Sequence, residues 1–376
     1  MEPDARPYDA SMTKRYRARL RRAAEATGRG GFGGLLVTPS ADLRYLTGYD
    51  PPPLERLTCL VVRPRRDPVL VVPALERPLA EGVGIDEVTE IRQWAETEDP
   101  YALVAALLGE APAVACSDRT WAAHLLPLQR TLGGTRFAPA SPVLGPLRAV
   151  KDRMELELLR RAGRYADAAV AELLKEPLET RTERQVAHRV GELLVEMGHD
   201  AVAFTIVGSG PNAASPHHGP TVREIRAGDA VVMDVGGRTD GYCSDVTRTV
   251  AVRRTPPDFE RVYEAVLEAQ ERAFEAVAPG VPAEEVDRAA RRVIERAGFG
   301  NLFMHRTGHG IGLEEHEDPY IVEGNRRPLR PGMCFSIEPG VYLPGEFGVR
   351  IEDIVTVTED GAERLNRASR DLAVVR

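Results

Sequence analysis

The chain of 376 residues is long enough for two domains that each bury a hydrophobic core, which excludes a small fold held together by disulfides. Hydrophobic residues make up 43% and charged residues 28% of the chain, a balance typical of a globular protein and not of a disordered one. Because 49 basic residues face 57 acidic ones and only 6% are aromatic, we expect no nucleic-acid partner.

The cysteines and the apolar runs indicate the cellular compartment of the protein. Four cysteines lie far apart without a CxxC pair, which favours free thiols in a reducing compartment. No apolar run approaches the roughly 18 residues of a membrane span, and the first ten residues lack the apolar segment of a secretory signal. We therefore expect a cytoplasmic protein without a membrane partner.

The first 145 residues are predicted to form an α/β domain. Short apolar runs bounded by turn residues alternate with helical patterns, as in a sheet covered by helices. Proline and glycine gather in residues 137–146, so we interpret this stretch as a linker and place the domain boundary after residue 145. The expected elements are a basic helix at 11–27, strands at 34–38, 57–62 and 69–72, and helices at 100–108 and 121–132.

Residues 146–376 are predicted to form a second domain of helices and strands. Asp152 can cap a long helix that ends before Pro177, and Thr182 with Gln185 forms a capping box at the next helix. Two pairs of strands carry acidic residues, which suggests two similar halves without a strict repeat. The other expected elements are helices at 258–277 and 282–297 and strands at 230–235, 242–252, 333–337 and 349–357.

Four carboxylates interrupt apolar strand patterns: Asp234, Asp245, Glu338 and Glu352. Each alone could be a strand-end residue or the partner of an arginine, but burying all four requires a cation. Together with one imidazole from the histidine-rich turn HRTGHGIGLEEHE, they match the oxygen-rich ligand set of two divalent ions such as Mn, Co, Zn or Fe. Thr247 shares a strand face with Asp245 and is a candidate to orient a metal-ligating side chain by a hydrogen bond.

The segments around these residues resemble the pita-bread metallopeptidases, which include methionine aminopeptidase, prolidase and aminopeptidase P. The matching segments are GSGPNAASPHH (208–218), MDVGG (233–237), YCSDVTRT (242–249), HRTGHGIGLEEHEDP (305–319), FSIEPGVY (335–342) and GVRIEDIV (348–355). Residues 35–49 and 147–162 resemble the two-domain prolidase branch. The resemblance implies an α/β domain of the creatinase/prolidase N-terminal type at 1–145, followed at 146–376 by an α+β pita-bread catalytic domain with a curved antiparallel sheet.

The resemblance also implies a role for each ligand candidate. Asp234 would chelate one of two divalent metal ions, Asp245 and Glu352 would bridge both, and His309 with Glu338 would complete the second site. A water or hydroxide held between the ions would attack the scissile carbonyl, and Glu338 would act as general base.

Three further residues take functional roles from the same resemblance. His217 would contact the substrate at the scissile bond, and His316 would stabilise the tetrahedral intermediate. Arg350 would either orient Glu352 or hold a substrate carboxylate, and the sequence leaves both readings open. His218 is adjacent to His217, so we expect its side chain to point elsewhere.

The separate N-terminal domain favours an Xaa-Pro peptidase over methionine aminopeptidase. The compact chain favours an Xaa-Pro dipeptidase (prolidase) on dipeptides, with aminopeptidase P on longer proline-containing peptides as the alternative. The complete ligand set argues against a metal-free creatinase-like C–N hydrolase and against a non-catalytic binding protein.

Manganese is the expected metal. The resemblance also implies a homodimer, in which the N-terminal domain of one subunit lies beside the active site of the other. Glu315 departs from the family pattern beside His316 and affects the expected polarity of the pocket.

Overall fold

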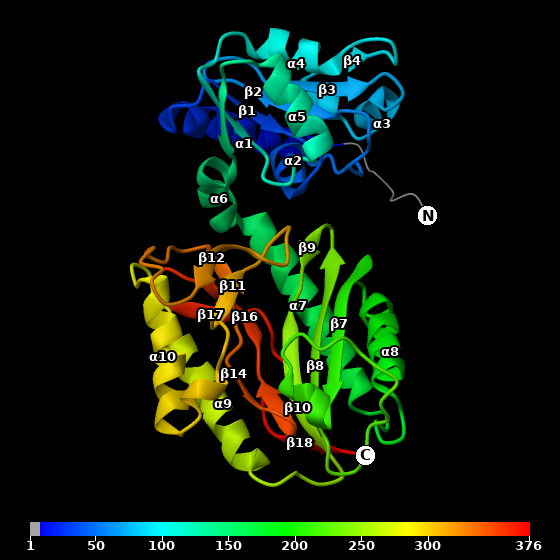
Figure 1. Ribbon diagram of the computed structural model, residues 1–376, viewed down its shortest axis with the longest axis vertical. Helices are drawn as coiled ribbons and strands as arrows, with labels where there is room; N and C mark the ends of the chain where they lie inside the picture. Colours follow the sequence, from blue (N-terminus) through cyan, green and yellow to red (C-terminus); the bar gives the residue numbers. More distant parts are fainter. Residues whose placement is uncertain (1–7) are drawn as a thin grey trace. The chain divides into compact units, whose positions relative to one another are not determined.

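A computed structural model describes residues 8–376, and the chain separates into two compact units (Figure 1). The N-terminal unit ends at Arg148 and the C-terminal unit begins at Ala149. Within residues 8–376, no helix combines the length and the apolar composition that a membrane span requires.

The N-terminal unit is a mixed sheet with helices. Its elements are α1 (Ala10–Arg29), β1 (Gly34–Val37), α2 (Ala41–Thr47), β2 (Cys59–Val62), β3 (Val69–Pro73), α3 (Arg77–Gly82), η1 (Ile85–Glu87), β4 (Glu90–Trp94), α4 (Pro100–Leu108), β5 (Ala113–Cys116), α5 (Ala122–Thr131), β6 (Arg136–Pro139) and α6 (Ser141–Ala149). The strand order is β4-β3-β2-β1-β5-β6, with β2 antiparallel to both of its neighbours and the other pairs parallel. Every residue of the four central strands is buried, as expected for a sheet enclosed by helices.

The predicted linker is wrong, because residues 137–146 fold as the end of β6 and most of α6. The side chain of Asp118 accepts hydrogen bonds from the amides of Ala140 and Ser141, at 2.8 and 3.0 Å, and so starts this helix. Pro142 follows in the first turn, where a missing N–H costs nothing. Proline therefore marks a helix start here and not a loop.

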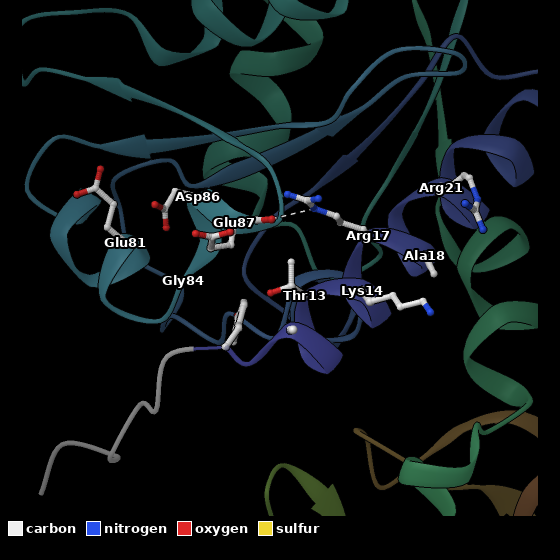
Figure 2. A pocket seen from close by; sticks show the side chains of 11 residues that line it. Thr13, Lys14, Arg17, Ala18, Arg21, Glu81, Gly84, Asp86 and Glu87 are labelled. Atoms are coloured by element: carbon white, nitrogen blue, oxygen red, sulfur yellow. Dashed lines mark hydrogen bonds between the residues drawn. The ribbon is translucent and has the colours of Figure 1, made fainter.

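A surface hollow of about 840 Å³ lies within the N-terminal unit and holds none of the predicted site residues (Figure 2). Its rim mixes Lys14 and Arg21 with Glu81 and Asp86. Arg17 spans it by donating from Nε to the carbonyl oxygen of Glu87 at 2.9 Å.

The C-terminal unit contains two five-stranded sheets, one two-stranded sheet and four long helices. Its elements are α7 (Arg153–Leu173), α8 (Glu183–Glu196), β7 (Ala201–Ser209), η2 (Gly210–Ala214), β8 (Ala230–Thr239), β9 (Tyr242–Cys243), β10 (Val246–Val252), α9 (Phe259–Glu275), α10 (Ala283–Arg296), η3 (Gly300–Leu302), β11 (Gly308–Gly310), β12 (Glu317–Ile321), β13 (Cys334–Ile337), β14 (Gly340–Leu343), β15 (Phe347–Arg350), β16 (Asp353–Val357), β17 (Ala362–Arg364) and β18 (Ala373–Val375). The predicted capping boxes are confirmed: Asp152 caps α7 together with Glu155, and Thr182 caps α8 together with Gln185.

The two sheets form similar halves, each packed against a helix pair. The first has the order β18-β10-β8-β7 and packs its apolar face on α7 and α8, whereas the second has the order β12-β11-β13-β16-β17 and packs on α9 and α10 (Figure 1). All ladders are antiparallel except that of β10 and β18. An isolated antiparallel bridge between Thr247 and Glu352 joins the sheets. The predicted curved antiparallel architecture is present, and this bridge marks its centre.

Two predicted strands are interrupted at the candidate ligands. The strand expected at 242–252 breaks at Asp245, and the one expected at 349–357 breaks at Glu352. At the first break, the hydroxyl of Ser244 accepts from the Gly237 amide at 2.9 Å, which replaces a regular ladder contact. The interruptions release both carboxylates from strict alternation between the two faces of a strand.

Candidate metal centre

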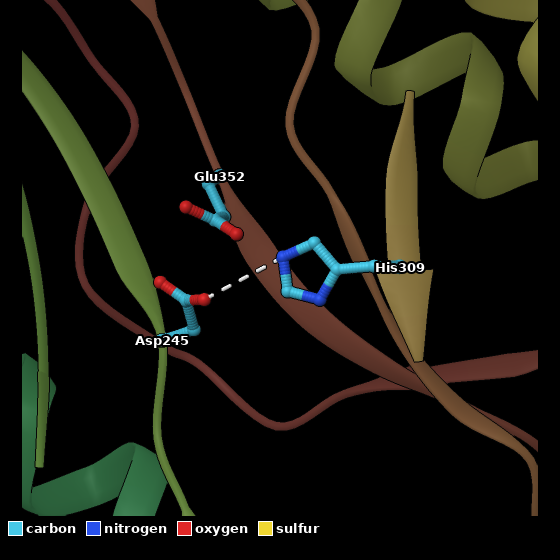
Figure 3. A group of neighbouring side chains, drawn as sticks. All are labelled: Asp245, His309 and Glu352. Carbon is cyan, nitrogen blue, oxygen red and sulfur yellow. Dashed lines mark ion pairs between the residues drawn. The ribbon is translucent and has the colours of Figure 1, made fainter. Parts of the chain in front are cut away.

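The structure brings the predicted ligands to the region where the two sheets meet. They come from the middle of β8 (Asp234), the break before β10 (Asp245), the middle of β11 (His309), the residue after β13 (Glu338) and the break before β16 (Glu352). Figure 3 shows the side chains of three of them pointing toward one another from three different strands. The segments are far apart in sequence, so only the folded sheets create this cluster.

The centre of the cluster is buried and tight. Ligand atoms of Asp245, His309 and Glu352 all lie within 4.8 Å of one another (Figure 3). His309 Nε2 lies 3.8 Å from Asp245 Oδ2 and 3.2 Å from Glu338 Oε1. Asp234 pairs with Thr247 in the β8–β10 ladder, next to the bridge with Glu352. Spacings of this size suit atoms that share a cation.

The carboxylates repel one another because the protein supplies too few partners. Asp234 Oδ1, Asp245 Oδ1 and Glu352 Oε1 are buried without a hydrogen-bond partner. Burial raises the pKa of Asp245 well above its usual range, and the charges of Glu352 and Asp234 raise it further. Burial likewise raises the pKa of Glu352, reinforced by Glu338 and Asp234. Three unpartnered oxygens beside an imidazole fit a divalent cation.

Glu338 differs from Asp245 and Glu352 because its side chain lies within hydrogen-bond distance of the His309 imidazole. Burial alone would raise its pKa, but the hydrogen bond and the charge of His309 outweigh burial and lower the pKa of Glu338 to about 2. The hydroxyl of Ser336 also donates to Glu338 Oε1 at 3.0 Å. Glu338 is therefore ionised at neutral pH.

A glycine lets His309 reach the cluster. A Cβ atom on Gly308 would lie 1.8 Å from the carbonyl oxygen of Ser336, so only glycine permits this approach of β11 to β13. The His309 amide donates to Ser336 Oγ at 3.0 Å, and His309 Nδ1 lies 3.2 Å from the Gly310 carbonyl oxygen. The contact at Nδ1 leaves Nε2 to face the carboxylates.

Arg350 contacts one predicted ligand directly and another through a threonine. Its Nη2 donates to Asp234 Oδ2 at 2.6 Å, and its Nε donates to Thr247 Oγ1 at 3.2 Å. Thr247 Oγ1 in turn donates to Glu352 Oε2 at 2.6 Å, so Thr247 does contact a candidate ligand, although a different one from Asp245. Burial alone would lower the pKa of Arg350, but the charges of Tyr342 and Asp234 keep it well above its usual value.

His316 also reaches the cluster. Its ring centroid lies 3.8 Å from that of His309, and its Nδ1 lies 3.3 Å from Arg306 Nη2. Burial, together with the charges of His309 and Arg306, lowers the pKa of His316 to about 4, so the ring is neutral at pH 7. Since a guanidinium only donates, Nδ1 accepts and the ring proton is on Nε2.

His217 is exposed in the segment after η2 and is not among the clustered side chains. The structure connects its backbone to the cluster through its neighbour, because Arg350 Nη1 donates to the Pro216 carbonyl oxygen at 3.3 Å. His218 faces away toward α8, with its Nε2 3.9 Å from Glu183 Oε2, as expected from the sequence.

Two further residues extend the network around Arg350. Arg350 Nη1 donates to the hydroxyl of Tyr342 at 2.9 Å, and His305 Nε2 lies 2.9 Å from the same hydroxyl. Burial raises the pKa of Tyr342 to about 12. Neither residue has a predicted role. The available signal was their place within the matching segments, at four residues before His309 and four after Glu338.

Comparison with known sequences identifies the family. Residues 157–359 match Metallopeptidase family M24, and residues 19–150 match the Creatinase/Prolidase N-terminal domain. The chain belongs to metallopeptidase family M24. The predicted combination of a creatinase/prolidase N-terminal domain with a pita-bread catalytic domain is thereby confirmed, as is the expectation of a metallopeptidase. Membership of M24 implies divalent metal ions, which the donor set of the cluster fits.

Several M24 relatives are similar over nearly their whole length. The chain is 47% identical to the probable dipeptidase PepE of Mycobacterium tuberculosis over 374 residues, which cover 99% of each chain. It is 38% identical to the Xaa-Pro dipeptidase of Lactobacillus helveticus, covering 89% of this chain and 92% of the relative. The crystal structure of dipeptidase PepE from Mycobacterium ulcerans superposes with a TM-score of 0.93 at 48% identity, covering 98% of this chain and 100% of the other.

Proposed function

We propose that this M24 metallopeptidase hydrolyses the Xaa-Pro peptide bond of dipeptides, as a prolidase does. The observation that carries the proposal is the cluster of His309 with Asp245 and Glu352, each of which has a buried carboxylate oxygen without a hydrogen-bond partner among the described residues. The names of the relatives support the substrate class, because one is a probable dipeptidase and another an Xaa-Pro dipeptidase. The proposed ligands of two divalent ions are Asp234, Asp245, His309, Glu338 and Glu352.

The chain's own residues supply proton transfer and charge stabilisation in this proposal. Divalent ions, when bound, supply Lewis acidity at the scissile carbonyl. Glu338 is ionised at neutral pH and accepts the proton of the attacking water as general base. His316 is neutral and carries its proton on Nε2, so it donates a hydrogen bond to the oxyanion as the tetrahedral intermediate forms. His217 contacts the substrate beside the scissile bond.

For Arg350 we propose the orienting role among the two readings that the sequence leaves open. Its guanidinium already contacts Asp234 directly and reaches Glu352 through Thr247. A guanidinium held by buried partners costs more to redirect toward a substrate than an exposed one does. Arg350 therefore serves the substrate indirectly, by fixing the carboxylates.

The remaining parts of the proposal concern the setting of the site. The catalytic domain comprises residues 146–376 and the N-terminal domain residues 1–145. Manganese is the proposed metal, with cobalt, zinc or iron as alternatives for a carboxylate-rich site. The protein is proposed to be cytoplasmic and homodimeric.

The test is product analysis of an equal mixture of Xaa-Pro dipeptides and Xaa-Pro-Yaa tripeptides, with Mn²⁺ and with a chelator. Chelator-sensitive cleavage of the dipeptides alone is the expected result. Cleavage of the tripeptides between Xaa and Pro would replace the proposal with aminopeptidase P activity. Cleavage of neither peptide would contradict Xaa-Pro hydrolysis, and Xaa-Ala dipeptides serve as the control for proline selectivity.

A further inference from the structure

The segment 209–221 between β7 and β8 carries His217 and is fastened at both of its ends. Most surface loops are held by their flanking strands alone and are mobile for that reason. Here the fastening comes from Glu183, the first residue of α8, whose side chain is completely buried. A buried carboxylate that is not part of the candidate metal centre requires an explanation of its own.

Each oxygen of Glu183 accepts from one end of the segment. Oε1 accepts from the amide of Ser209 at 2.8 Å and from its hydroxyl at 2.7 Å. Oε2 accepts from the amide of Thr221 at 3.0 Å and from its hydroxyl at 2.6 Å. Asn212 Nδ2 lies between the two oxygens, at 3.0 and 3.1 Å. One carboxylate therefore joins two backbone positions that are twelve residues apart in the chain.

The charge of Glu183 is stabilised by these hydrogen-bond donors. Burial alone would raise its pKa, but the hydrogen bonds from Thr221 and Ser209 outweigh burial and lower it. Hydrogen bonds to a charged acceptor are stronger than neutral ones, and unmade buried donors are costly. The segment and the carboxylate therefore depend on each other.

The opposite side of the segment packs on the strand that leads to Arg350. A Cβ atom on Gly348 would lie 2.1 Å from the Ala213 carbonyl oxygen, so the absence of a side chain lets η2 contact β15 directly. Arg350 Nη1 then donates to the Pro216 carbonyl oxygen at 3.3 Å. The segment is thus fixed by α8 on one side and by β15 on the other.

This double fastening separates the two adjacent histidines. His218 faces Glu183, with its Nε2 3.9 Å from Glu183 Oε2. His217 is the next residue along the chain and remains exposed. The backbone that presents His217 is consequently fixed at Pro216 by Arg350 and at His218 by its position beside Glu183.

We propose that Glu183 is a positioning residue for His217. By holding Ser209 and Thr221, it fixes the segment that presents the imidazole to the substrate. The inference rests on the proposed function, in which His217 contacts the substrate at the scissile bond. Loss of Glu183 should act through His217 and leave the metal ligands unaffected.

Glu284 offers a matched control in the other half of the same unit. It lies in the first turn of α10, is largely buried, and accepts from the Gly324 amide at 3.1 Å and from Arg288 Nη2 at 3.1 Å. The loop that it holds carries none of the proposed site residues. Glu284→Gln therefore reports what the loss of a buried, loop-holding carboxylate costs when no catalytic histidine depends on it.

The experiment is a double-mutant cycle in the full-length, Mn²⁺-loaded chain. Glu183→Gln keeps the side-chain volume, but in either orientation its amide NH₂ faces a backbone N–H, of Ser209 or of Thr221. We expect kcat/KM for an Xaa-Pro dipeptide to fall about 10- to 100-fold, as for other misplacements of a catalytic group. In the His217→Ala background, the same change should cost less than about twofold. Bound metal should stay unchanged, and Glu284→Gln should leave kcat/KM near the wild-type value.

Equal losses in both backgrounds would show that Glu183 acts on the whole domain and would overturn the inference. Thr221→Val removes one donor to the same carboxylate and provides a milder variant if Glu183→Gln does not fold. If the losses in kcat/KM from Thr221→Val and His217→Ala are additive, the inference is overturned there too. Hydrogen exchange supplies a readout that is independent of activity, since the amides of Ser209 and Thr221 should lose protection in Glu183→Gln. Unchanged exchange in 209–221 would contradict the fastening. A wild-type chain that cleaves no dipeptide would overturn the proposed function, and exchange would still decide whether Glu183 holds the segment.

Discussion

Two adjacent acidic residues, Glu352 and Asp353, are both 1% exposed but have opposite surroundings. Asp353 Oδ1 accepts from Arg248 Nη2 at 2.7 Å, and its Oδ2 lies 3.4 and 3.6 Å from the Nε atoms of Arg364 and Arg370. Glu352 Oε2 accepts only from a hydroxyl, and Glu352 Oε1 is buried without a partner. The chain thus surrounds the Asp353 carboxylate with positive charges, whereas one oxygen of the adjacent Glu352 carboxylate has no hydrogen-bond partner among the described residues.

The difference teaches which buried charges serve the fold and which serve a ligand. A buried charge without a partner is costly, so a stable protein keeps one only where something else completes it. Among the described residues, Asp245 and Glu352 at the candidate metal centre each keep one buried oxygen without a hydrogen-bond partner, whereas arginines surround Asp353. Substitutions on the two sides should therefore have opposite consequences for stability and for activity.

The largest contrast is expected between Asp245→Asn and Asp353→Ala. Asp245→Asn should lower kcat/KM at least about 1000-fold, which corresponds to about 4 kcal/mol of transition-state stabilisation, and should reduce bound metal. It should not lower the free energy of unfolding of the metal-free chain, because it relieves repulsion with Glu352. Asp353→Ala should cost about 3–5 kcal/mol of stability, because it leaves Arg248 buried and uncompensated. Peptidase assays, metal analysis and urea unfolding measure these effects.

The two variants control for each other. Full metal content and turnover in Asp245→Asn would refute its assignment as a ligand. Destabilisation of the metal-free chain by Asp245→Asn to the same extent as by Asp353→Ala would erase the distinction between the two kinds of buried charge.

His316→Ala should have the next largest effect, a loss on the order of 100-fold in kcat with metal retained. The His316 ring contacts His309 but is not a proposed metal ligand. Removal of this neutral ring therefore takes away a hydrogen-bond donor and not a charge. Steady-state kinetics with metal analysis tests this, and His188→Ala is the matched control, because the His188 side chain is exposed on α8. An unchanged kcat would return His316 to a structural role.

Arg350→Lys tests how the carboxylates of the candidate metal centre depend on a neighbouring guanidinium. Lysine keeps the positive charge but cannot contact Asp234, Thr247 and Tyr342 together, as the guanidinium does. We expect a 10- to 100-fold weaker affinity for metal and little change in KM at saturating metal, as for the loss of a group that orients ligands. A large rise in KM with unchanged metal affinity would instead favour the alternative reading, a contact with the substrate carboxylate.

Local sequence signals predicted much of this structure. The capping boxes at Asp152 and Thr182 depend on residues three apart, so they can be read directly from the chain. The ligand candidates were found because a carboxylate such as Asp234 conflicts with an apolar strand pattern. The location of the two helix pairs and of about half of the strands followed from periodicity in the same way.

Long-range partners could not be predicted, because they depend on which segments the folded sheets bring together. Arg248 and Asp353 are 105 residues apart, and nothing near either one announces the pair. The interruptions at Asp245 and Glu352 also arise from contacts between strands and not from local propensity. No sequence signal indicated the role of Glu183, because its donors come from a later segment.

The smallest expected effect is the pH dependence of the metal-free chain. Because the pKa values of Asp245 and Glu352 are raised in the folded state, that state binds more protons than the unfolded chain above about pH 4, where free carboxyls ionise. Their contribution to the free energy of unfolding therefore falls as pH rises toward neutrality. The pKa of Glu338 is lowered to about 2, so the contribution of Glu338 to the free energy of unfolding rises with pH. This contribution no longer changes above the pH at which free glutamates ionise. Thermal melts between pH 5 and pH 7 should show the metal-free chain losing stability relative to the Asp245→Asn variant as pH rises. A metal-free chain that gains as much stability over this interval as the variant does would show that the buried carboxylates at this site do not repel one another.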